Sequence, residues 1–146
     1  MPGRHFWLLQ RVTTQRRIHP MHRSRLAGFI IDSRTDDLDG AAEFWSRALG
    51  YATKPSDNPE DSNYVLFDTG PDGIHIEVQR VTHPSRVHLD IETDDIEAEV
   101  ERLEKLGARR IEQVRTWWVM EAPSGHRFCV VRSGGGSFDK EANRWE

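Results

Sequence analysis

Residues 27 to 132 contain the same supersecondary unit twice, and this internal repeat limits the folds that the chain can adopt. The segment from Phe29 to Leu38 aligns with the segment from Val87 to Ile96, and both include a Thr-Asp-Asp sequence before a helical pattern. Each copy then reaches a Leu-Gly pair and later a Pro-x-Gly turn followed by an apolar run. A repeated half of this size usually cannot close its own core, so we expect the two halves to pack together. The seam between them is a natural place for a ligand cavity.

Hydrophobic periodicity predicts one βαβββ module in residues 26–80 and a second in residues 86–132. In each module, a strand precedes a helix whose apolar residues recur at i, i+3, i+4 and i+7. We expect Asp36 and Asp94 to cap the two helices, and Gly50 to end the first as a left-handed glycine. Three further strands complete each module. The fold predicted is an α+β protein, in which a curved, partly closed eight-stranded mixed sheet surrounds a cavity.

The segments outside the repeat differ from it in composition. Residues 1–25 contain six arginines and no acidic residue, and we expect a basic, disordered leader there. A mitochondrial targeting segment and a translation start at Met21 are two alternatives. Residues 133–146 begin with Ser-Gly-Gly-Gly-Ser, which is typical of a flexible linker before a short tail. In that tail, Phe138 and Trp145 could dock onto the domain or onto a partner.

Charge and composition restrict the partners and the location that we expect. Without residues 1–25, the formal charge of −4 becomes −10, from 14 basic and 24 acidic groups, which argues against nucleic acid as a partner. No apolar run approaches the ~18 residues that would span a membrane. The single cysteine excludes an internal disulfide and is consistent with a reducing cytosol. We therefore expect a cytoplasmic protein with a small-molecule ligand.

Strand alternation predicts which side chains face the cavity. On the strand around Glu77, alternate apolar residues should cover the helix, while Glu77 and its polar neighbours His75 and Gln79 turn the other way. The same reasoning applied to the other central strands adds a set of inward side chains: Ile30, Asp32, His88, Asp90, Arg127 and Cys129. An open sheet that shows these side chains to water is the alternative, because half-solvated sheets alternate in the same manner.

His88 and Glu77 form the sharpest pair of candidate catalytic residues. They could form part of a metal site, or the imidazole could act as an acid or base oriented by the carboxylate. A hydrogen-bonded pair without chemistry is the alternative. Asp32 and Asp90 occupy equivalent places in the two modules, where they could contact a ligand or tie down a neighbouring strand.

Three further residues are candidates for ligand binding. Trp117 and Trp118 are adjacent, so one should face the helix layer and one the cavity, and we assign Trp118 to an aromatic ligand wall. Arg127 could meet an anionic substrate or remain solvated. Cys129 could act as a nucleophile or a soft metal ligand, or could simply fill the core.

These motifs resemble those of the vicinal oxygen chelate superfamily, which includes glyoxalase I, bleomycin-resistance proteins and extradiol dioxygenases. The resemblance covers roughly residues 26–132 and is greatest to small glyoxalase-like proteins. It rests on three groups of residues: Thr35-Asp36-Asp37-Leu38 with Phe44-Trp45 and Leu49-Gly50, Val87-His88-Leu89-Asp90 with Asp94-Asp95-Ile96, and the segment from Ala122 to Val131. Such motifs indicate the fold better than the reaction, because one fold hosts many activities.

The resemblance also implies where a metal ion would bind. Enzymes of the superfamily place ligands on the first and last strand of each module, and the equivalent positions here are Ile30, Glu77, His88 and Cys129. Because isoleucine cannot ligate, the resemblance implies a divalent ion held by Glu77 and His88, with Asp32, Asp90 or His75 as a third ligand, or no metal at all.

Two functions follow from the resemblance. The first is metal-assisted lyase, isomerase or dioxygenase-type chemistry on a small organic molecule. The second is metal-free binding of a drug or metabolite, as in bleomycin-resistance proteins. A homodimer is compatible with either function, because members of the superfamily often pair. The sequence does not decide whether the chain is an enzyme.

Overall fold

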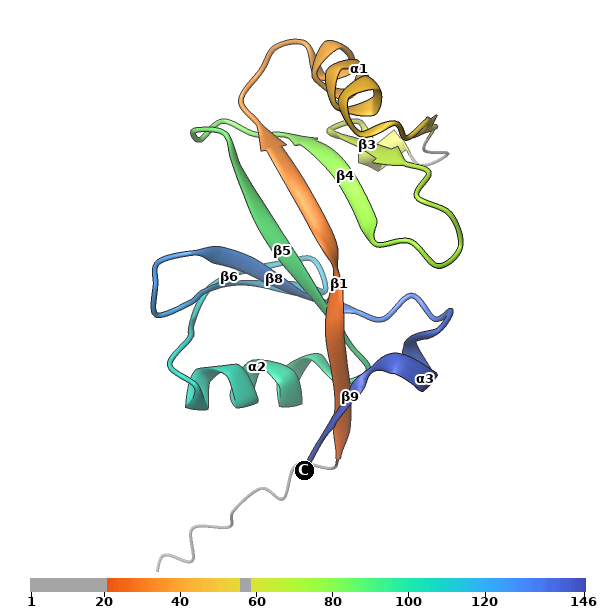
Figure 1. Ribbon diagram of the computed structural model, residues 1–146. Coiled ribbons are helices and arrows are strands. Elements are labelled where there is room, and N and C mark those ends of the chain that lie inside the picture. Colours follow the sequence, from red (N-terminus) through yellow and green to blue (C-terminus); the bar gives the residue numbers. More distant parts are fainter. Residues whose placement is uncertain (1–20, 56–58) are drawn as a thin grey trace, which may run out of the picture.

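The computed structural model describes residues 21–55 and 59–146, and the described residues form one mixed sheet with helices against it (Figure 1). The first module contains β1 (His22–Ser33), α1 (Leu38–Leu49), β2 (Thr53–Lys54), η1 (Pro59–Asp61), β3 (Tyr64–Phe67) and β4 (His75–Arg80). The second contains β5 (Arg86–Thr93), α2 (Ile96–Lys105), β6 (Arg109–Val114), β7 (Trp117–Glu121) and β8 (Arg127–Arg132). The chain then forms α3 (Phe138–Glu141) and β9 (Asn143–Trp145).

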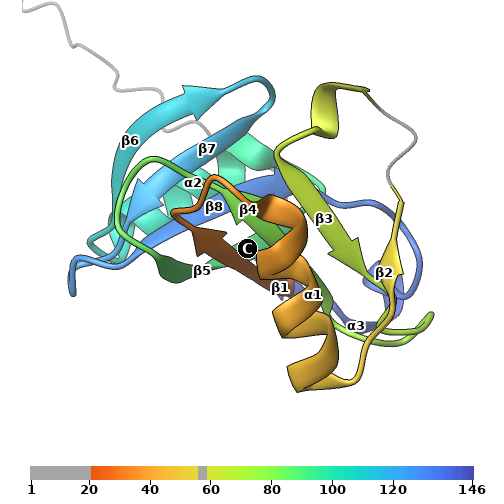
Figure 2. The same ribbon diagram turned by 90° about the horizontal axis from the view of Figure 1, so that it is seen from above.

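The sheet order is β2-β3-β4-β1-β5-β8-β7-β6, and β9 pairs with β1 outside this path. The predicted α+β fold of two βαβββ modules is therefore confirmed, with a ninth strand in addition to the eight expected. The modules join through the antiparallel pair β1–β5, while β1–β4 and β5–β8 are parallel. The sheet is strongly curved, so that β3 of the first module and β7 of the second lie on opposite sides of its concave face (Figure 2).

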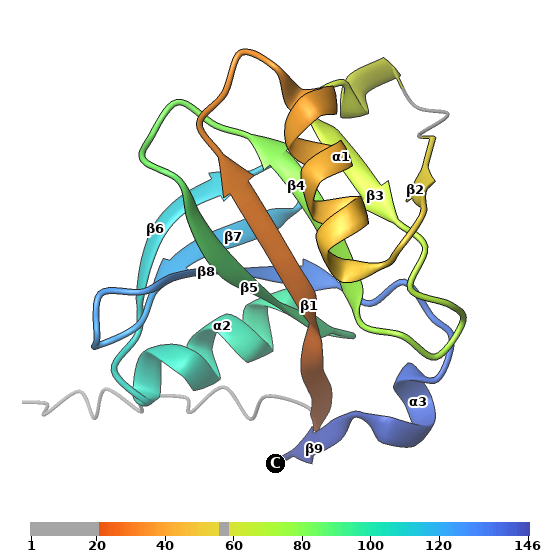
Figure 3. The same cartoon turned by 45° about the horizontal axis from the view of Figure 1, so that its top comes forward.

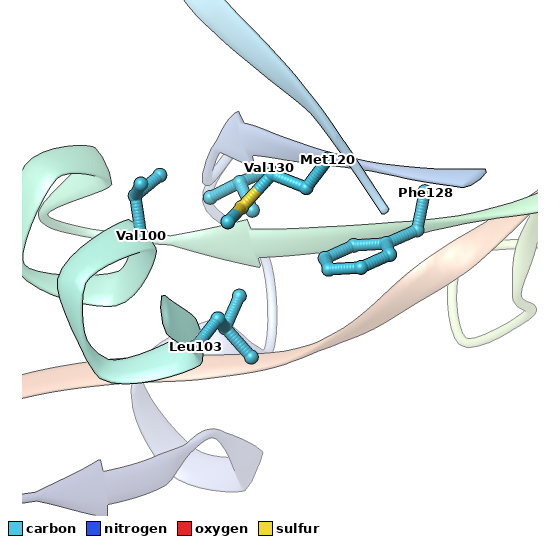
Figure 4. Packing of buried hydrophobic residues seen from close by; sticks show 5 residues of the cluster. All are labelled: Val100, Leu103, Met120, Phe128 and Val130. Atoms are coloured by element: carbon cyan, nitrogen blue, oxygen red, sulfur yellow. The ribbon is translucent and has the colours of Figure 1, made fainter. Parts of the chain in front are cut away.

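The two long helices, α1 and α2, each cover a separate apolar cluster on the outer face of their own module. Under α2, the buried cluster consists of Val100, Leu103, Met120, Phe128 and Val130 (Figure 4). Under α1, it consists of Leu38, Phe67 and Val78. Since the apolar side chains of the strands turn outward to the helices, the alternate side chains of the same strands turn to the concave face.

Both long helices begin one residue later than the sequence predicted. The N-cap residues are Asp37 and Asp95, whose side chains accept hydrogen bonds from backbone N–H groups in the first turn, and not Asp36 and Asp94. The cause is the preceding threonine: Thr93 Oγ1, for example, accepts from the backbone N–H of Asp95 at 3.1 Å, as Thr35 does in the first module. Gly50 ends α1 in the left-handed conformation at φ 78°, as expected.

The two ends of the domain lie together, which corrects the predicted boundary of the leader. Strand β1 begins at His22 and not near Ala27, because β9 supplies pairing partners for residues 22–24. In Figure 3, β9 and α3 lie beside the lower half of β1, beyond the reach of β4. Residues 22–25 thus belong to the sheet, whereas the disordered leader, the targeting segment and the start at Met21 concern residues 1–20, which lie outside the described residues.

The tail docks onto its own domain, and this resolves an alternative that the sequence left open. Phe138 is buried, and the indole N–H of Trp145 donates to Ser24 Oγ at 2.8 Å. The guanidinium of Arg102 on α2 lies 3.9 Å from the centre of the Trp145 ring. Among the described residues, no helix has both the length and the apolar composition needed to cross a membrane.

Candidate functional site

A cavity of about 810 Å³ opens on the concave face between the two modules. Of the side chains that strand alternation placed on the inner face, the cavity is lined by Ile30, Asp32, Glu77, Gln79, His88, Asp90, Arg127 and Cys129, whereas His75 is not part of the lining. The remaining wall includes apolar and aromatic residues from β3, β6 and β7, namely Tyr64, Leu66, Ile111, Val114, Trp117 and Val119. The lining therefore combines many charged and polar side chains with an apolar and aromatic part, and a concave site between two modules is a usual place for a small-molecule ligand.

His88 on β5 is fixed by a carboxylate from the other module. Its Nδ1–H donates to Asp32 Oδ2 at 2.7 Å, across the β1–β5 pair. On the other side of the ring, His88 Nε2 lies 3.5 Å from Asp90 Oδ1, a close approach of the two groups that lacks hydrogen-bond geometry. Burial alone would lower the pKa of His88, but Asp32, Asp90 and Cys129 outweigh it and raise the pKa to about 11. The site therefore favours a positive charge at His88.

Two carboxylate oxygens beside His88 are buried without a hydrogen bond from the described residues: Asp32 Oδ1 and Asp90 Oδ1. The Asp32 side chain is only 2% exposed, and Arg86 Nε and His83 Nε2 lie 3.8 and 3.9 Å from its Oδ2. Buried acceptors of this kind normally find a partner in the protein or in ordered solvent. They therefore mark a place that favours a proton donor or a cation.

Glu77 reaches the same cavity but is not brought into contact with His88. Ile30 on β1 pairs with Glu77 on one side and His88 on the other, so the two lie two strands, or about 10 Å, apart along the sheet. Glu77 Oε2 instead lies 3.4 Å from Nε2 of His75 on the same strand. Their hydrogen bond raises the pKa of His75. Glu77 and His88 therefore line the same cavity without contacting each other.

The four metal positions implied by the superfamily do not form a metal centre. Ile30, at one of them, is a hydrocarbon side chain with 2% exposure. Among the described residues, the group whose donor atoms could share an ion is instead His88, Asp90 and Cys129, with all three atoms within 4.8 Å of one another. Glu77 is not part of this group, although Asp90 was foreseen as a third ligand.

The cavity is lined by Trp117 and not by its neighbour Trp118, to which the ligand wall was assigned. Trp118 pairs with Val130 and packs against the core under α2, while Trp117 borders the cavity. The assignment to Trp118 was therefore wrong. Met120 shows which face of β7 turns to the core. It is fully buried there, and Trp118, two residues earlier on the strand, points to the same side.

Arg127 lines the cavity, as do Tyr64 and Arg86, two residues that the sequence analysis did not single out. Arg127 Nε lies 3.2 Å from Glu121 Oε2, so the guanidinium charge is partly neutralised by an ion pair within the protein. Tyr64 accepts a hydrogen bond at its hydroxyl from Gln79 Nε2 at 2.9 Å, and burial raises its pKa. Arg86 could have been found from its spacing, because it precedes His88 by two residues on the same strand.

Comparisons with known proteins agree with this geometry. The family model of the glyoxalase-like domain matches residues 28–131. Methylmalonyl-CoA epimerase from Mycobacterium tuberculosis has a similar structure, with a TM-score of 0.57, 16% identity and coverage of 75% of this chain and 88% of that one. A variant of the Streptomyces coelicolor epimerase in complex with 2-nitronate-propionyl-CoA gives a TM-score of 0.51 at 16% identity, over 76% and 98% of the two chains.

A larger enzyme shares the fold as well. 2,2',3-Trihydroxybiphenyl 1,2-dioxygenase from Sphingomonas wittichii gives a TM-score of 0.53 at 14% identity and covers 77% of this chain but 42% of its own. At these identities the likeness concerns the fold alone. No curated protein is significantly similar in sequence.

Proposed function

Because the chain belongs to the glyoxalase-like domain family, within the vicinal oxygen chelate superfamily, we propose that it binds a small organic molecule in the cavity and polarises one of its oxygen atoms at His88. The observation that carries this proposal is the state of the His88 ring. Nδ1 is engaged by Asp32, whereas Nε2 approaches Asp90 Oδ1 only to 3.5 Å, and His88 lines the cavity.

The cavity has an apolar part that can hold the body of a ligand and a polar part, at His88, that can contact one of its oxygen atoms. Trp117, Leu66 and Val119 offer an apolar and aromatic surface to the body of a ligand, where burial supplies affinity. His88 offers a fixed polar atom to an oxygen of the ligand, because the hydrogen bond to Asp32 prevents the ring from turning. A preorganised polar group of this kind stabilises negative charge that develops on the oxygen during a reaction.

The chemistry supported is therefore a rearrangement, elimination or isomerisation beside a carbonyl or enol oxygen. A high pKa makes His88 a poor general base near neutral pH, and this favours a polarising role over the acid/base role. The four-position metal set of the superfamily does not fit here, so no step of this proposal passes through it.

Sequestration of a ligand without chemistry is the second candidate. It is favoured by Ile30, which occupies a metal-ligand position of the superfamily's enzymes with an inert side chain. The hydrogen bond between His88 and Asp32 also favours sequestration, because it gives both polar side chains a partner within the protein when no cofactor is bound.

Thermal-shift measurements on chelator-treated protein test the proposal. A panel of small carboxylic acids, phenols and acyl-CoA thioesters should contain compounds that raise the melting temperature of the wild type. His88→Gln should weaken their binding by about tenfold or more, as expected for a lost hydrogen bond of about 1.4 kcal/mol. His126→Gln, at an exposed histidine outside the cavity, should leave binding unchanged.

The outcome separates the candidates. Equal binding by the wild type and His88→Gln, or no binding by any compound of the panel, contradicts the proposal. For compounds that do bind, NMR spectra of the ligand after incubation distinguish conversion from sequestration.

A further inference from the structure

The cavity wall beside the β4–β5 connection carries an arginine that the proposed function does not use. Arg86 is the first residue of β5 and lines the cavity. It lies two residues before His88, so the two side chains share one face of the strand. Its register partner on β1 is Asp32, whose partner on the other side is Gln79 of β4. These three partners form one row of side chains across the concave face, and the row contains one carboxylate and one guanidinium.

Two neighbours contact the Arg86 guanidinium along the same edge. Its Nη2–H donates to His83 Nε2 at 3.4 Å, and its Nε lies 3.8 Å from Asp32 Oδ2. His83 Nε2 and Asp32 Oδ2 are only 3.9 Å apart, so both partners face the Nε–Nη2 edge. The Nδ1–H of His83 donates to the carbonyl oxygen of Pro84 at 2.9 Å, which leaves Nε2 as the acceptor. The imidazole and the carboxylate therefore orient the guanidinium from one side.

The other edge of the guanidinium is open to a ligand. Arginine has five N–H donors in a rigid fork, and the Arg86 side chain makes no further hydrogen bond with the described residues. Nη1 and the second N–H of Nη2 are available together, in the geometry that binds the two oxygens of a carboxylate. Arg86 is 46% exposed and Asp32 only 2%, so an anion that enters from solvent meets the guanidinium before the buried carboxylate.

The positive charge of Arg86 is only partly balanced within the protein. Among the described residues, Asp32 is the one carboxylate that forms an ion pair with it. The short hydrogen bond of that carboxylate, at 2.7 Å, goes to His88, whose pKa of about 11 keeps it positively charged near neutral pH. The acidic residues Glu77 and Asp90 lie opposite other residues of β1. This part of the cavity therefore favours an anion.

Two other arginines of the cavity wall are less suited to the same task. Arg127, which the sequence suggested for an anionic substrate, has its Nε 3.2 Å from Glu121 Oε2. Arg115 has its Nη1 3.7 Å from Glu60 Oε2. Neither of these carboxylates is shared with a hydrogen-bonded histidine, whereas the carboxylate beside Arg86 is. Arg86 is therefore a better candidate for binding an anion than Arg115 or Arg127.

One small molecule can reach Arg86 and His88 at the same time. Arg86 Nε and His88 Nδ1 lie 3.8 and 2.7 Å from the same oxygen, Oδ2 of Asp32, so the two nitrogens are at most about 6.5 Å apart. Each residue would contact a ligand oxygen over a hydrogen bond of about 2.7–3.2 Å. The two oxygen-bearing groups of such a ligand would be separated by a few covalent bonds.

We infer that Arg86 binds a carboxylate of the ligand, and that the ligand class is therefore a small organic acid with a carbonyl or enol oxygen a few bonds away. The Arg86 fork fixes the acid group, and His88 contacts the second oxygen. The apolar wall at Trp117 and Val119 holds the remainder of the molecule. The inference rests on the proposed function for the role of His88, but carboxylate binding by Arg86 can succeed or fail independently of it.

Binding of two aromatic keto acids and of their methyl esters tests the inference. Benzoylpropionate and phenylpyruvate each combine a ring, a carbonyl oxygen and a carboxylate, and esterification removes only the negative charge. Dissociation constants are measured by NMR titration of isotope-labelled, chelator-treated protein containing the full chain. For the wild type, we expect at least one acid to bind about tenfold or more tightly than its ester, as for a hydrogen bond between charged groups.

Variants of Arg86 show whether this residue causes the preference. Arg86→Gln should weaken binding of the acid by about tenfold or more and that of the ester by less than about twofold. Arg86→Lys keeps the charge without the fork and should give an intermediate affinity for the acid. Arg47→Gln, at an exposed arginine of α1 outside the cavity, should bind both compounds as the wild type does. Circular dichroism and melting temperatures establish that each variant is folded.

Three results would overturn the carboxylate site: neither acid binds, acid and ester bind the wild type equally, or Arg86→Gln weakens both to the same extent. The failure of the proposed function looks different. If binding of the acid depends on Arg86 but is unchanged in His88→Gln, the function at His88 is rejected and the carboxylate site stands. If the esters bind through His88 but the acids gain nothing from Arg86, the carboxylate site is rejected and the function stands.

Discussion

The carboxylate of Asp32, on the first strand of one module, accepts a hydrogen bond of 2.7 Å from His88, on the first strand of the other. The two residues are offset by two positions across the antiparallel β1–β5 pair, where Ile30 and not Asp32 is the register partner of His88. The contact therefore joins the halves of the repeat at the floor of the cavity. It also makes the orientation of the candidate catalytic histidine depend on both modules.

Replacement of Asp32 by asparagine should reveal how much this contact contributes. Asp32→Asn keeps the shape of the side chain and removes its charge, so we expect the free energy of unfolding to fall by about 1.5–3 kcal/mol, the range for hydrogen bonds to charged groups. Urea denaturation measures the change. Asp36→Asn, at an exposed aspartate of the following loop, should change it by less than about 0.5 kcal/mol, and similar losses in both variants would refute this role.

The two adjacent tryptophans should separate stability from ligand binding. Trp118→Ala removes a side chain that packs against the α2 core, and we expect a loss of about 2–4 kcal/mol in unfolding free energy. Trp117→Ala removes a wall of the cavity and should weaken ligand binding with a smaller loss of stability. Denaturation and ligand titration of both variants check this, and a reversed pattern would show that the faces of β7 are assigned incorrectly.

The C-terminal tail should contribute to the stability of the domain. Trp145→Ala removes both the hydrogen bond to Ser24 and the contact with Arg102. From the usual contributions of a hydrogen bond and a cation–π contact we expect a loss of about 1–2.5 kcal/mol. Arg144→Ala, at the exposed neighbouring position of the same strand, is the control. Thermal unfolding that does not distinguish the two variants would mean that the tail is not docked in solution.

A buried ionic cluster under the tail should govern stability in acid. His22 Nε2–H and the Arg102 guanidinium both donate to the fully buried carboxylate of Glu99, His22 at 2.6 Å and Arg102 Nη2 at 2.7 Å. Burial by itself would raise the pKa of Glu99, but the hydrogen bonds from Arg102, His22 and Ser24 hold it below the usual value of 4.5. A carboxyl with a lowered pKa stabilises the fold above pH 4.5 and loses this contribution as the pH falls below it.

The acid limb of the stability curve should therefore be steeper in the wild type than in Glu99→Gln. One such group contributes at most about 1.4 kcal/mol per pH unit below pH 4.5. Urea denaturation between pH 7 and pH 3 measures the slopes. Glu112→Gln, at an exposed glutamate, should retain the steep limb, and parallel curves for the wild type and Glu99→Gln would contradict the account.

The fold and the identity of the inward-facing side chains could be predicted from the sequence, because both depend on short-range periodicity. Asp32, Glu77, His88 and Cys129 lie on one face because strand residues alternate, and the repeat of the module determines that the strands meet. The same reasoning failed for Trp118. Alternation gives two possible phases for a pair of adjacent tryptophans, and only the pairing of Trp118 with Val130 in the core decides between them.

Other features depend on contacts between distant parts of the chain. The start of β1 at His22 requires β9, which comes more than a hundred residues later. The close approach of His88 to Asp90 and Cys129 depends on side-chain rotamers and on the β5–β8 register. Neither has a local signal in the sequence. Glu77 was therefore grouped with His88 because strand alternation turned both inward and the resemblance implied both positions.

The indole N–H resonances of Trp117 and Trp118 give the most direct test that the cavity at His88 is the ligand site. An NMR titration of isotope-labelled, chelator-treated protein with a compound that raises its melting temperature reports on both rings and on the His88 imidazole at once. Our account predicts that the signals of Trp117 and His88 shift with saturation, while those of Trp118 and Trp145 remain in place. A ligand that shifts Trp118 or Trp145 and leaves Trp117 and His88 unchanged would contradict it.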